Sequence, residues 1–115
     1  MGKGVDNTVR IHFVHGEWKA EPGWKPVAAG EEVVWLAYDC DDFQLYLPDI
    51  FQDQHPGAQC RLFRGKRSGI KREVKVCRIT ATVKDDVLPG PYSYAGFVDG
   101  DPVVGGSSPG VIVDP

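Results

Sequence analysis

The sequence lacks the long apolar runs that membrane insertion requires. None of its apolar stretches approaches the roughly 20 residues needed to cross a bilayer. The start, MGKGVDNTVR, has no hydrophobic signal region, and Asp6 stands where a myristoylation signal needs Ser or Thr. We therefore expect no transmembrane segment, and a protein that either works in the cytoplasm or is exported with its signal peptide removed.

Sulfur-containing residues are scarce as well. Met1 is the one methionine, and the three cysteines, Cys40, Cys60 and Cys77, form no CxxC pair and no zinc-type spacing. At most one disulfide can therefore form within the chain. The sequence also contains no nucleophile elbow, phosphate loop or HExxH motif. These absences predict a protein that is not an enzyme and carries no cofactor.

Glycine and proline, in contrast, are abundant, with 14 and 9 among 115 residues, and they separate short apolar runs. This punctuation favours an all-β protein, and Asp99-Gly100 is a dipeptide typical of a tight hairpin turn. Hydrophobic residues make up 42% of the chain and charged residues 25%, which matches an ordinary globular domain. At this length we expect a single domain over residues 1–115.

Several short runs show the period of two that is typical of β-strands. Apolar and polar residues alternate over residues 8–15, 43–47 and 92–98. Residues 33–38 instead form a continuous apolar run bounded by turns. Such a run predicts a central strand covered on both faces, with Trp35 as its largest side chain.

Two tryptophans, Trp18 and Trp24, lie in the Gly- and Pro-rich stretch from Gly16 to Pro26, which we predict to be a loop. Large aromatic side chains are mostly buried, so the pair is expected to cap one end of the core. The alternative is an exposed aromatic platform for a sugar, a peptide or a partner protein. The sequence is compatible with both interpretations.

Candidate metal ligands are few and dispersed. The turn Asp39–Asp42 surrounds Cys40 with carboxylates that could attract a hard cation, but it lacks the later Gly and Glu of a calcium loop, which favours a solvated acidic turn. His12 and His15 are three residues apart on a predicted strand and so face opposite sides. His55 stands alone in an irregular segment.

The most distinctive local signal is a basic segment at residues 60–78. It holds eight of the thirteen Lys and Arg residues and one of the sixteen acidic residues. The basic residues are Arg61, Arg64, Lys66, Arg67, Lys71, Arg72, Lys75 and Arg78. The whole chain, by comparison, has a formal net charge of −3. The segment is therefore a local positive region on an otherwise acidic molecule.

A two-residue turn at Ser68-Gly69 would fold this segment into a β-hairpin. The register then places three pairs opposite each other: Phe63 and Val74, Arg64 and Glu73, Cys60 and Cys77. The first two are favourable cross-strand pairs. The third could form a disulfide in an oxidising compartment, or two neighbouring thiols in a reducing one. We predict a hairpin inserted at about residues 59–78.

Two functions fit this basic hairpin. It could be an electrostatic docking arm for an acidic protein, an anionic lipid or a nucleic acid. It could also simply protect a sheet edge and keep the protein soluble. The hairpin has no interleaved tyrosines or tryptophans, which argues against a dedicated nucleic-acid platform.

Two stretches together resemble the cupredoxin-like β-sandwich. They are residues 27–45, VAAGEEVVWLAYDCDDFQL, and residues 79–113, which include the Pro-Gly-x-Tyr-x-Tyr entry to a strand. Residues 48–76 fall outside the resemblance and look like an insertion. The resemblance implies a copper site, but Phe43 or Gln44 stands where the family places its first histidine. The closing loop, AGFVDGDPVVGGSSPG, contains no Cys, His or Met. A blue-copper site needs a thiolate, two imidazoles and a weak axial ligand, so we predict none here.

The sequence therefore predicts one antiparallel Greek-key β-sandwich of about seven or eight strands, cupredoxin-like, with an immunoglobulin-like sandwich as the alternative. The expected function is a copper-free, non-catalytic binding module. Its basic hairpin, with Trp18 and Trp24, would dock an acidic macromolecule, most simply a protein. Two alternatives are a metal-binding protein with a displaced site formed by the histidines, Cys40 and Asp39–Asp42, and a purely structural domain of a larger assembly.

Overall fold

The computed structural model describes residues 7–67, 70–104 and 108–115, which form β-strands and connecting loops without any helix. No segment of this described part could cross a membrane as a helix. The strands are β1 Thr8–Val14, β2 Glu17–Glu21, β3 Trp24–Val27, β4 Glu32–Tyr38, β5 Phe43–Tyr46, β6 Gln59–Arg67, β7 Ile70–Thr82, β8 Gly90–Ser93, β9 Ala95–Val98, β10 Asp101–Val104 and β11 Gly110–Val113.

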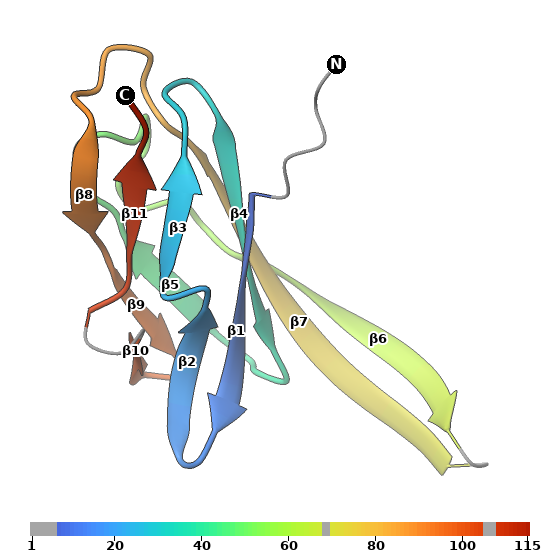
Figure 1. The fold of residues 1–115 in the computed structure, drawn as a ribbon. Helices are drawn as coiled ribbons and strands as arrows, with labels where there is room; N and C mark the ends of the chain where they lie inside the picture. Colours follow the sequence, from blue (N-terminus) through green and yellow to red (C-terminus); the bar gives the residue numbers. More distant parts are fainter. Residues whose placement is uncertain (1–6, 68–69, 105–107) are drawn as a thin grey trace.

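The strands form two sheets (Figure 1). The long sheet has the order β5-β9-β10-β2-β1-β4-β7-β6, and the short sheet has the order β3-β11-β8. Val27 and Val111 of the short sheet are buried in the same apolar cluster as Ile11 and Trp35 of the long sheet. The predicted all-β sandwich is therefore confirmed.

The pairing of strands differs from the purely antiparallel, seven- or eight-stranded arrangement that the sequence suggested. β1 pairs with β4, β2 with β10 and β3 with β11 in parallel, and the described part holds eleven strands. Alternation of apolar residues identifies a strand, but it carries no information on a partner that lies far away in the sequence. The sheets are therefore mixed.

In two segments the strands and loops differ from those predicted. The stretch expected to be a loop, 16–26, contains β2 and most of β3, because Trp18 and Ala20 point into the core and alternate with polar neighbours. The run 92–98, expected to be one strand, breaks at Tyr94 into β8 and β9, which belong to different sheets. The Asp99-Gly100 turn is confirmed between β9 and β10, where both residues have the positive φ of a tight hairpin.

Trp35 lies at the centre of the core, as predicted. Its side chain is 0% exposed and its ring contacts those of Phe51 and Tyr94 at centroid distances of 5.7 and 5.6 Å. β4, which carries Trp35, lies inside the long sheet between β1 and β7. Only one face of β4 is fully buried, however. Leu36, on the opposite face, is only partly buried, so the cover expected on both faces is complete on one face and partial on the other.

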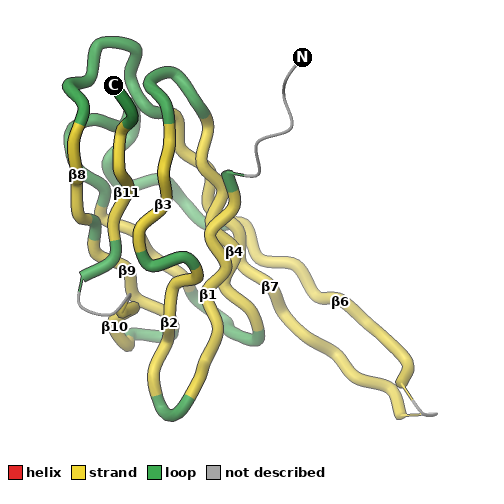
Figure 2. The backbone as a smooth tube through the Cα atoms, viewed as in Figure 1, coloured by secondary structure: helices red, strands yellow, loops and turns green. Residues whose placement is uncertain are grey.

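β6 and β7 form a long antiparallel hairpin that projects from the sandwich (Figures 1 and 2). Residues 76–82 of β7 pair with β4, and the carbonyl oxygen of Lys75 accepts hydrogen bonds from the N–H groups of Asp39 and Cys40. Residues 70–74 pair with β6. The register is the one deduced from the sequence, because Cys60 lies opposite Cys77 and Arg64 opposite Glu73. The predicted turn residues Ser68 and Gly69 lie outside the described part. We call residues 59–67 and 70–78 the basic arm.

Candidate functional site

The basic arm separates the charges of the molecule in space. Residues 60–78 contain eight of the thirteen basic residues and one of the sixteen acidic ones, so the segment has a formal charge of +7 and the remainder −10. The arm projects from the sandwich (Figure 1), which carries the remaining charge, and at its base Lys75 pairs with Asp41. The result is a dipolar molecule with a positive extension.

Only part of the basic set has side chains that the structure describes. Arg64 forms an exposed ion pair with Glu73, with Nε 3.3 Å from Oε1, and Lys75 Nζ lies 3.5 Å from Asp41 Oδ1. Exposed pairs of this kind contribute only up to about 1 kcal/mol, so they leave the guanidinium and ammonium groups accessible to a partner. The side chains of four predicted site residues lie outside the described part. They are Lys66, Arg67, Lys71 and Arg72.

Arg61 and Arg78 lie on one face of the arm, beside a shallow hollow of about 190 Å³. The ladders place Arg61 opposite Val76 and Arg78 opposite Leu36, so these side chains share one face of the long sheet. Phe63, which is 53% exposed, lies on the same face. The hollow is lined by Leu36, Gln59, Arg61, Phe63, Val76 and Arg78. It combines two guanidinium groups with an apolar floor.

The apolar component of the arm was not predicted from the sequence. Leu62 and Phe63 are 51% and 53% exposed, although both belong to types that are usually buried. Their exposure could have been predicted from their position within a run of basic residues. Apolar residues on a hairpin that projects from the sandwich have no core in which to be buried. The arm thus offers apolar contact as well as charge.

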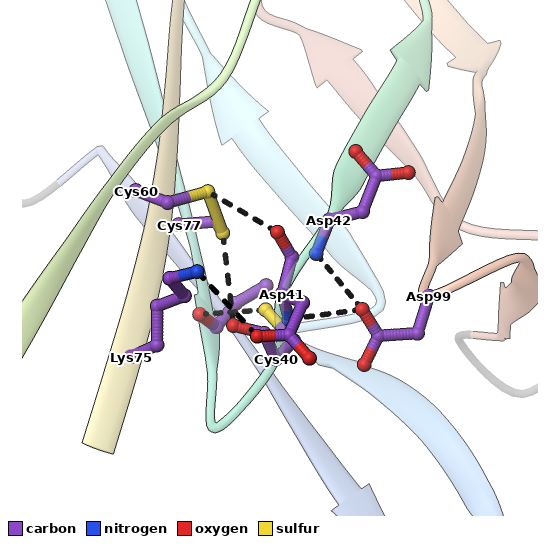
Figure 3. The surroundings of a disulfide bond; sticks show 8 residues. Cys40, Asp41, Asp42, Cys60, Lys75, Cys77 and Asp99 are labelled. Atoms are coloured by element: carbon purple, nitrogen blue, oxygen red, sulfur yellow. Dashed lines mark hydrogen bonds and ion pairs between the residues drawn. A yellow bond between two sulfur atoms is a disulfide. The ribbon is translucent and has the colours of Figure 1, made fainter. Parts of the chain in front are cut away.

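A disulfide fixes the base of the basic arm. Cys60 and Cys77 are joined, with a Cα–Cα distance of 3.9 Å, and the structure therefore contains the disulfide that the sequence allowed (Figure 3). The Cys60 sulfur lies 3.9 Å from the carbonyl oxygen of Asp41, and the Cys77 sulfur 4.0 Å from that of Cys40. Disulfide sulfurs carry no proton, so these are packing contacts. The bond holds β6 to β7 where the hairpin leaves the sandwich.

The turn Asp39–Asp42 beside the disulfide is closed by a carboxylate. Asp99 Oδ1 accepts hydrogen bonds from the backbone N–H groups of Asp41 and Asp42 at 2.9 and 2.8 Å (Figure 3). This role of Asp99, which lies 57 residues from Asp42, has no local sequence signal. The expected acidic turn is thus ordered by the neighbouring β9–β10 turn. Across residues 7–67, 70–104 and 108–115, no group of three or more His, Cys, Asp or Glu side chains is arranged to hold a metal ion.

The free thiol of Cys40 is buried under this turn. Its Sγ lies 3.4 Å from the carbonyl oxygen of Ala37. Burial raises the pKa of the Cys40 thiol to about 11, and the nearby carboxylate of Asp99 adds to the rise. A thiolate, which metal binding and nucleophilic attack require, is therefore disfavoured at neutral pH.

Cys40 should consequently resist thiol reagents in the folded protein. At about pH 8 a group with this raised pKa is almost wholly protonated, and burial blocks access as well. We expect no measurable reaction with Ellman's reagent until denaturant is added, and then one thiol per chain. Rapid reaction of the native protein, absent from a Cys40→Ala control, would contradict the buried placement.

The three histidines belong to no group of three or more potential metal ligands among the described residues. The His12 ring stacks on that of Tyr38 at 4.8 Å, on the outer face of the long sheet. His15 lies in the turn after β1, and His55 Nδ1 is 2.9 Å from the carbonyl oxygen of Leu45. These residues do not assemble the thiolate and two imidazoles of a blue-copper centre, so the residues present do not fit that cofactor.

The two tryptophans pack into the sandwich to different extents. Trp18 is only 6% exposed and packs against Phe13 at a centroid distance of 5.2 Å, so the prediction that it forms part of an exposed platform is wrong. Trp24 is half-buried and lies so close to Gly110 that a Cβ there would collide with its ring. Neither is brought near the basic arm by the pairing of strands, because β2 and β3 are not neighbours of β6 or β7. The burial of Trp18 in the core cluster favours the capping interpretation over the exposed platform.

Comparison with known proteins gives structural neighbours only. No known family and no curated protein matches the sequence. Among solved structures, an oxidised proline-to-glycine mutant of amicyanin is 14% identical, with a TM-score of 0.49 over 97% of this chain and 87% of that one. The reduced Cu(I) form at pH 4 of a second proline-to-glycine mutant of amicyanin is 12% identical, with a TM-score of 0.47 over 96% of this chain and 85% of that one. Amicyanin is a cupredoxin, the family that the sequence resembles. At these identities and TM-scores the likeness carries no conclusion about copper or function.

Proposed function

We propose that this chain is a non-catalytic, copper-free binding module that docks a partner protein with an acidic surface through the basic arm. The observation that carries the proposal is the separation of a +7 segment from a −10 remainder on a hairpin that projects from the sandwich. A concentrated charge steers diffusional encounter with an opposite surface and selects against like-charged partners.

The shape of the arm supports a protein partner over an extended polyanion. A nucleic acid or an anionic membrane presents negative charge over a wide area, which would also meet the acidic sandwich. A protein can place a limited acidic patch against the arm alone. The exposed Leu62 and Phe63 favour the same conclusion, because protein interfaces combine apolar contact with charge at their rim.

We propose a copper-free protein because none of its three cysteines is available as a thiolate ligand. Cys60 and Cys77 are joined in a disulfide, and the pKa of the Cys40 thiol is raised to about 11. In a Cu(II) titration of the purified protein we therefore expect no intense thiolate-to-copper band in the visible spectrum and no metal retained after gel filtration. A strong band near equimolar copper, lost in Cys40→Ala, would mean that a displaced site assembles and would restore electron transfer as the function.

The docking proposal is tested with two fluorescent peptides of about nine residues, long enough to follow one strand. One alternates glutamate with valine, and the other alternates lysine with valine. Although the protein has a net charge of −3, we expect it to bind the glutamate peptide, because the arm is locally positive. Preference for the lysine peptide in fluorescence anisotropy would show that the acidic sandwich is the interacting surface, and would overturn the proposal.

A further inference from the structure

The outer edge of β6 offers unpaired backbone groups. β6 ends the long sheet and, in the described part, pairs only with β7. Directly opposed residues of an antiparallel ladder alternate between hydrogen-bonded pairs, about 5.5 Å apart at Cα, and closer pairs without hydrogen bonds. Cys60 and Cys77 lie 3.9 Å apart at Cα, so they form a pair of the second kind. The N–H and C=O groups of Cys60, and by the period of two those of Leu62 and Arg64, therefore point away from β7.

This edge carries few of the features by which proteins block edge-to-edge pairing. Such features include a short strand, a proline, a bulge or an inward-pointing charge. β6 instead runs for nine residues without proline, and its register with β7 is continuous from Gln59 to Arg67. Positive charge is the remaining protection. It repels a second basic edge, including the same edge of another copy of this chain, but it attracts an acidic strand.

Side-chain contacts lie on both faces of this edge. Arg61 and Phe63 face the hollow on one side. On the other side Leu62 lines a second hollow with Lys75, and this hollow also contains three carboxylates, those of Asp39, Asp41 and Glu73. A strand added beside β6 would send alternate side chains to these two faces. Acidic side chains can then meet Arg61 on the first face, and apolar ones can meet Phe63 on that face and Leu62 on the other.

We propose that the acidic partner binds as an extended segment added to the outer edge of β6, in which acidic and apolar residues alternate. The inference rests on the proposed function and makes it more specific. Backbone hydrogen bonds to residues 60, 62 and 64 supply part of the affinity, and the side chains that flank the edge select the acidic sequence. The competing occupant, a second copy of this chain, is disfavoured by charge.

The test removes one outward backbone donor. Leu62→Pro eliminates the N–H that points away from β7, and edge strands accept proline where the N–H faces solvent. Leu62→Ala removes the side chain and keeps the donor. With the glutamate-valine peptide we expect Leu62→Pro to weaken binding about tenfold or more, whereas Leu62→Ala weakens it about threefold or less.

A modified peptide gives the same test without altering the protein. N-methylation of two neighbouring central residues removes a donor from both edges of the peptide and leaves its charge unchanged. We expect the wild-type protein to bind this peptide about tenfold more weakly. If circular dichroism shows that Leu62→Pro does not fold, this comparison still tests whether backbone hydrogen bonds contribute to peptide binding.

The outcomes separate this inference from the proposed function. Equal binding of the plain and methylated peptides by the wild-type protein, with hairpin charge still required, would overturn strand addition and leave electrostatic docking intact. No binding of either acidic peptide would overturn both. Concentration-dependent dimerisation of the free protein that Leu62→Pro abolishes would identify a second copy as the occupant, and would overturn the assignment of an acidic partner.

Discussion

Reversal of the positive charge at the tip of the basic arm is expected to lower affinity for an acidic partner about a hundredfold or more. The variant changes five residues to glutamate: Arg64, Lys66, Arg67, Lys71 and Arg72. Like charges brought together across an interface cost several kcal/mol, and each 1.4 kcal/mol corresponds to about a tenfold change in affinity. Fluorescence anisotropy with the glutamate-valine peptide measures the effect. In the wild-type protein, raising the salt concentration from about 50 to 200 mM should also weaken binding, because the charges are exposed.

The chain provides a matched control for this experiment. Five basic residues lie outside the arm, and their reversal gives the same change in net charge: Lys3, Arg10, Lys19, Lys25 and Lys84. If the arm is the docking surface, this control should bind the peptide within a few-fold of the wild-type protein, since charges beyond the Debye length of about 10 Å are largely screened. Equal loss of binding in both variants would mean that net charge alone governs the interaction.

Removal of the Trp35 side chain is expected to lower the free energy of unfolding by about 3–5 kcal/mol, as is typical for a buried tryptophan replaced by alanine. Trp35 is 0% exposed and its ring contacts Phe51 and Tyr94, so Trp35→Ala would leave a cavity between the two sheets. Domains are stable by about 5–15 kcal/mol, so the loss would be a large share of the total. Urea unfolding followed by circular dichroism measures it.

Leu88→Ala serves as the control, because it also removes a large apolar side chain but at a position that is 76% exposed. Its effect should stay within about 0.5 kcal/mol. A loss below about 1 kcal/mol for Trp35→Ala would contradict its placement at the centre of the core.

The sequence allowed local features to be predicted better than distant ones. The β6–β7 register followed from one assumed turn, because a hairpin pairs neighbours in the chain and charge and size complementarity then check each pair. The parallel pairing of β1 with β4 joins strands that are separated by two others, and no local pattern indicates it. The same limit applies to β8 and β9, which the sequence pattern predicts as one strand. Tyr94 suits a strand, and only the packing of two sheets shows that the chain changes sheet there.

In the candidate site, too, features formed by residues close in sequence were predicted and those formed by distant residues were not. The basic residues and the Cys60–Cys77 pair were visible because they are close in sequence. The hollow beside Arg61 needs Leu36 from β4, and the closure of the acidic turn needs Asp99 from the β9–β10 turn. Such contacts arise from the tertiary arrangement. Trp18 was assigned to a loop because Gly and Pro flank it, although the alternation of Trp18 and Ala20 already indicated a strand.

The most direct test of the account is an amide chemical-shift map of the ¹⁵N-labelled protein titrated with the glutamate-valine peptide. We expect the largest changes on β6 and residues 70–78 of β7, with the amides of Leu62 and Arg64 among them. Changes confined to the sandwich, for example around β3 and β8, would show that the basic arm is not the docking surface.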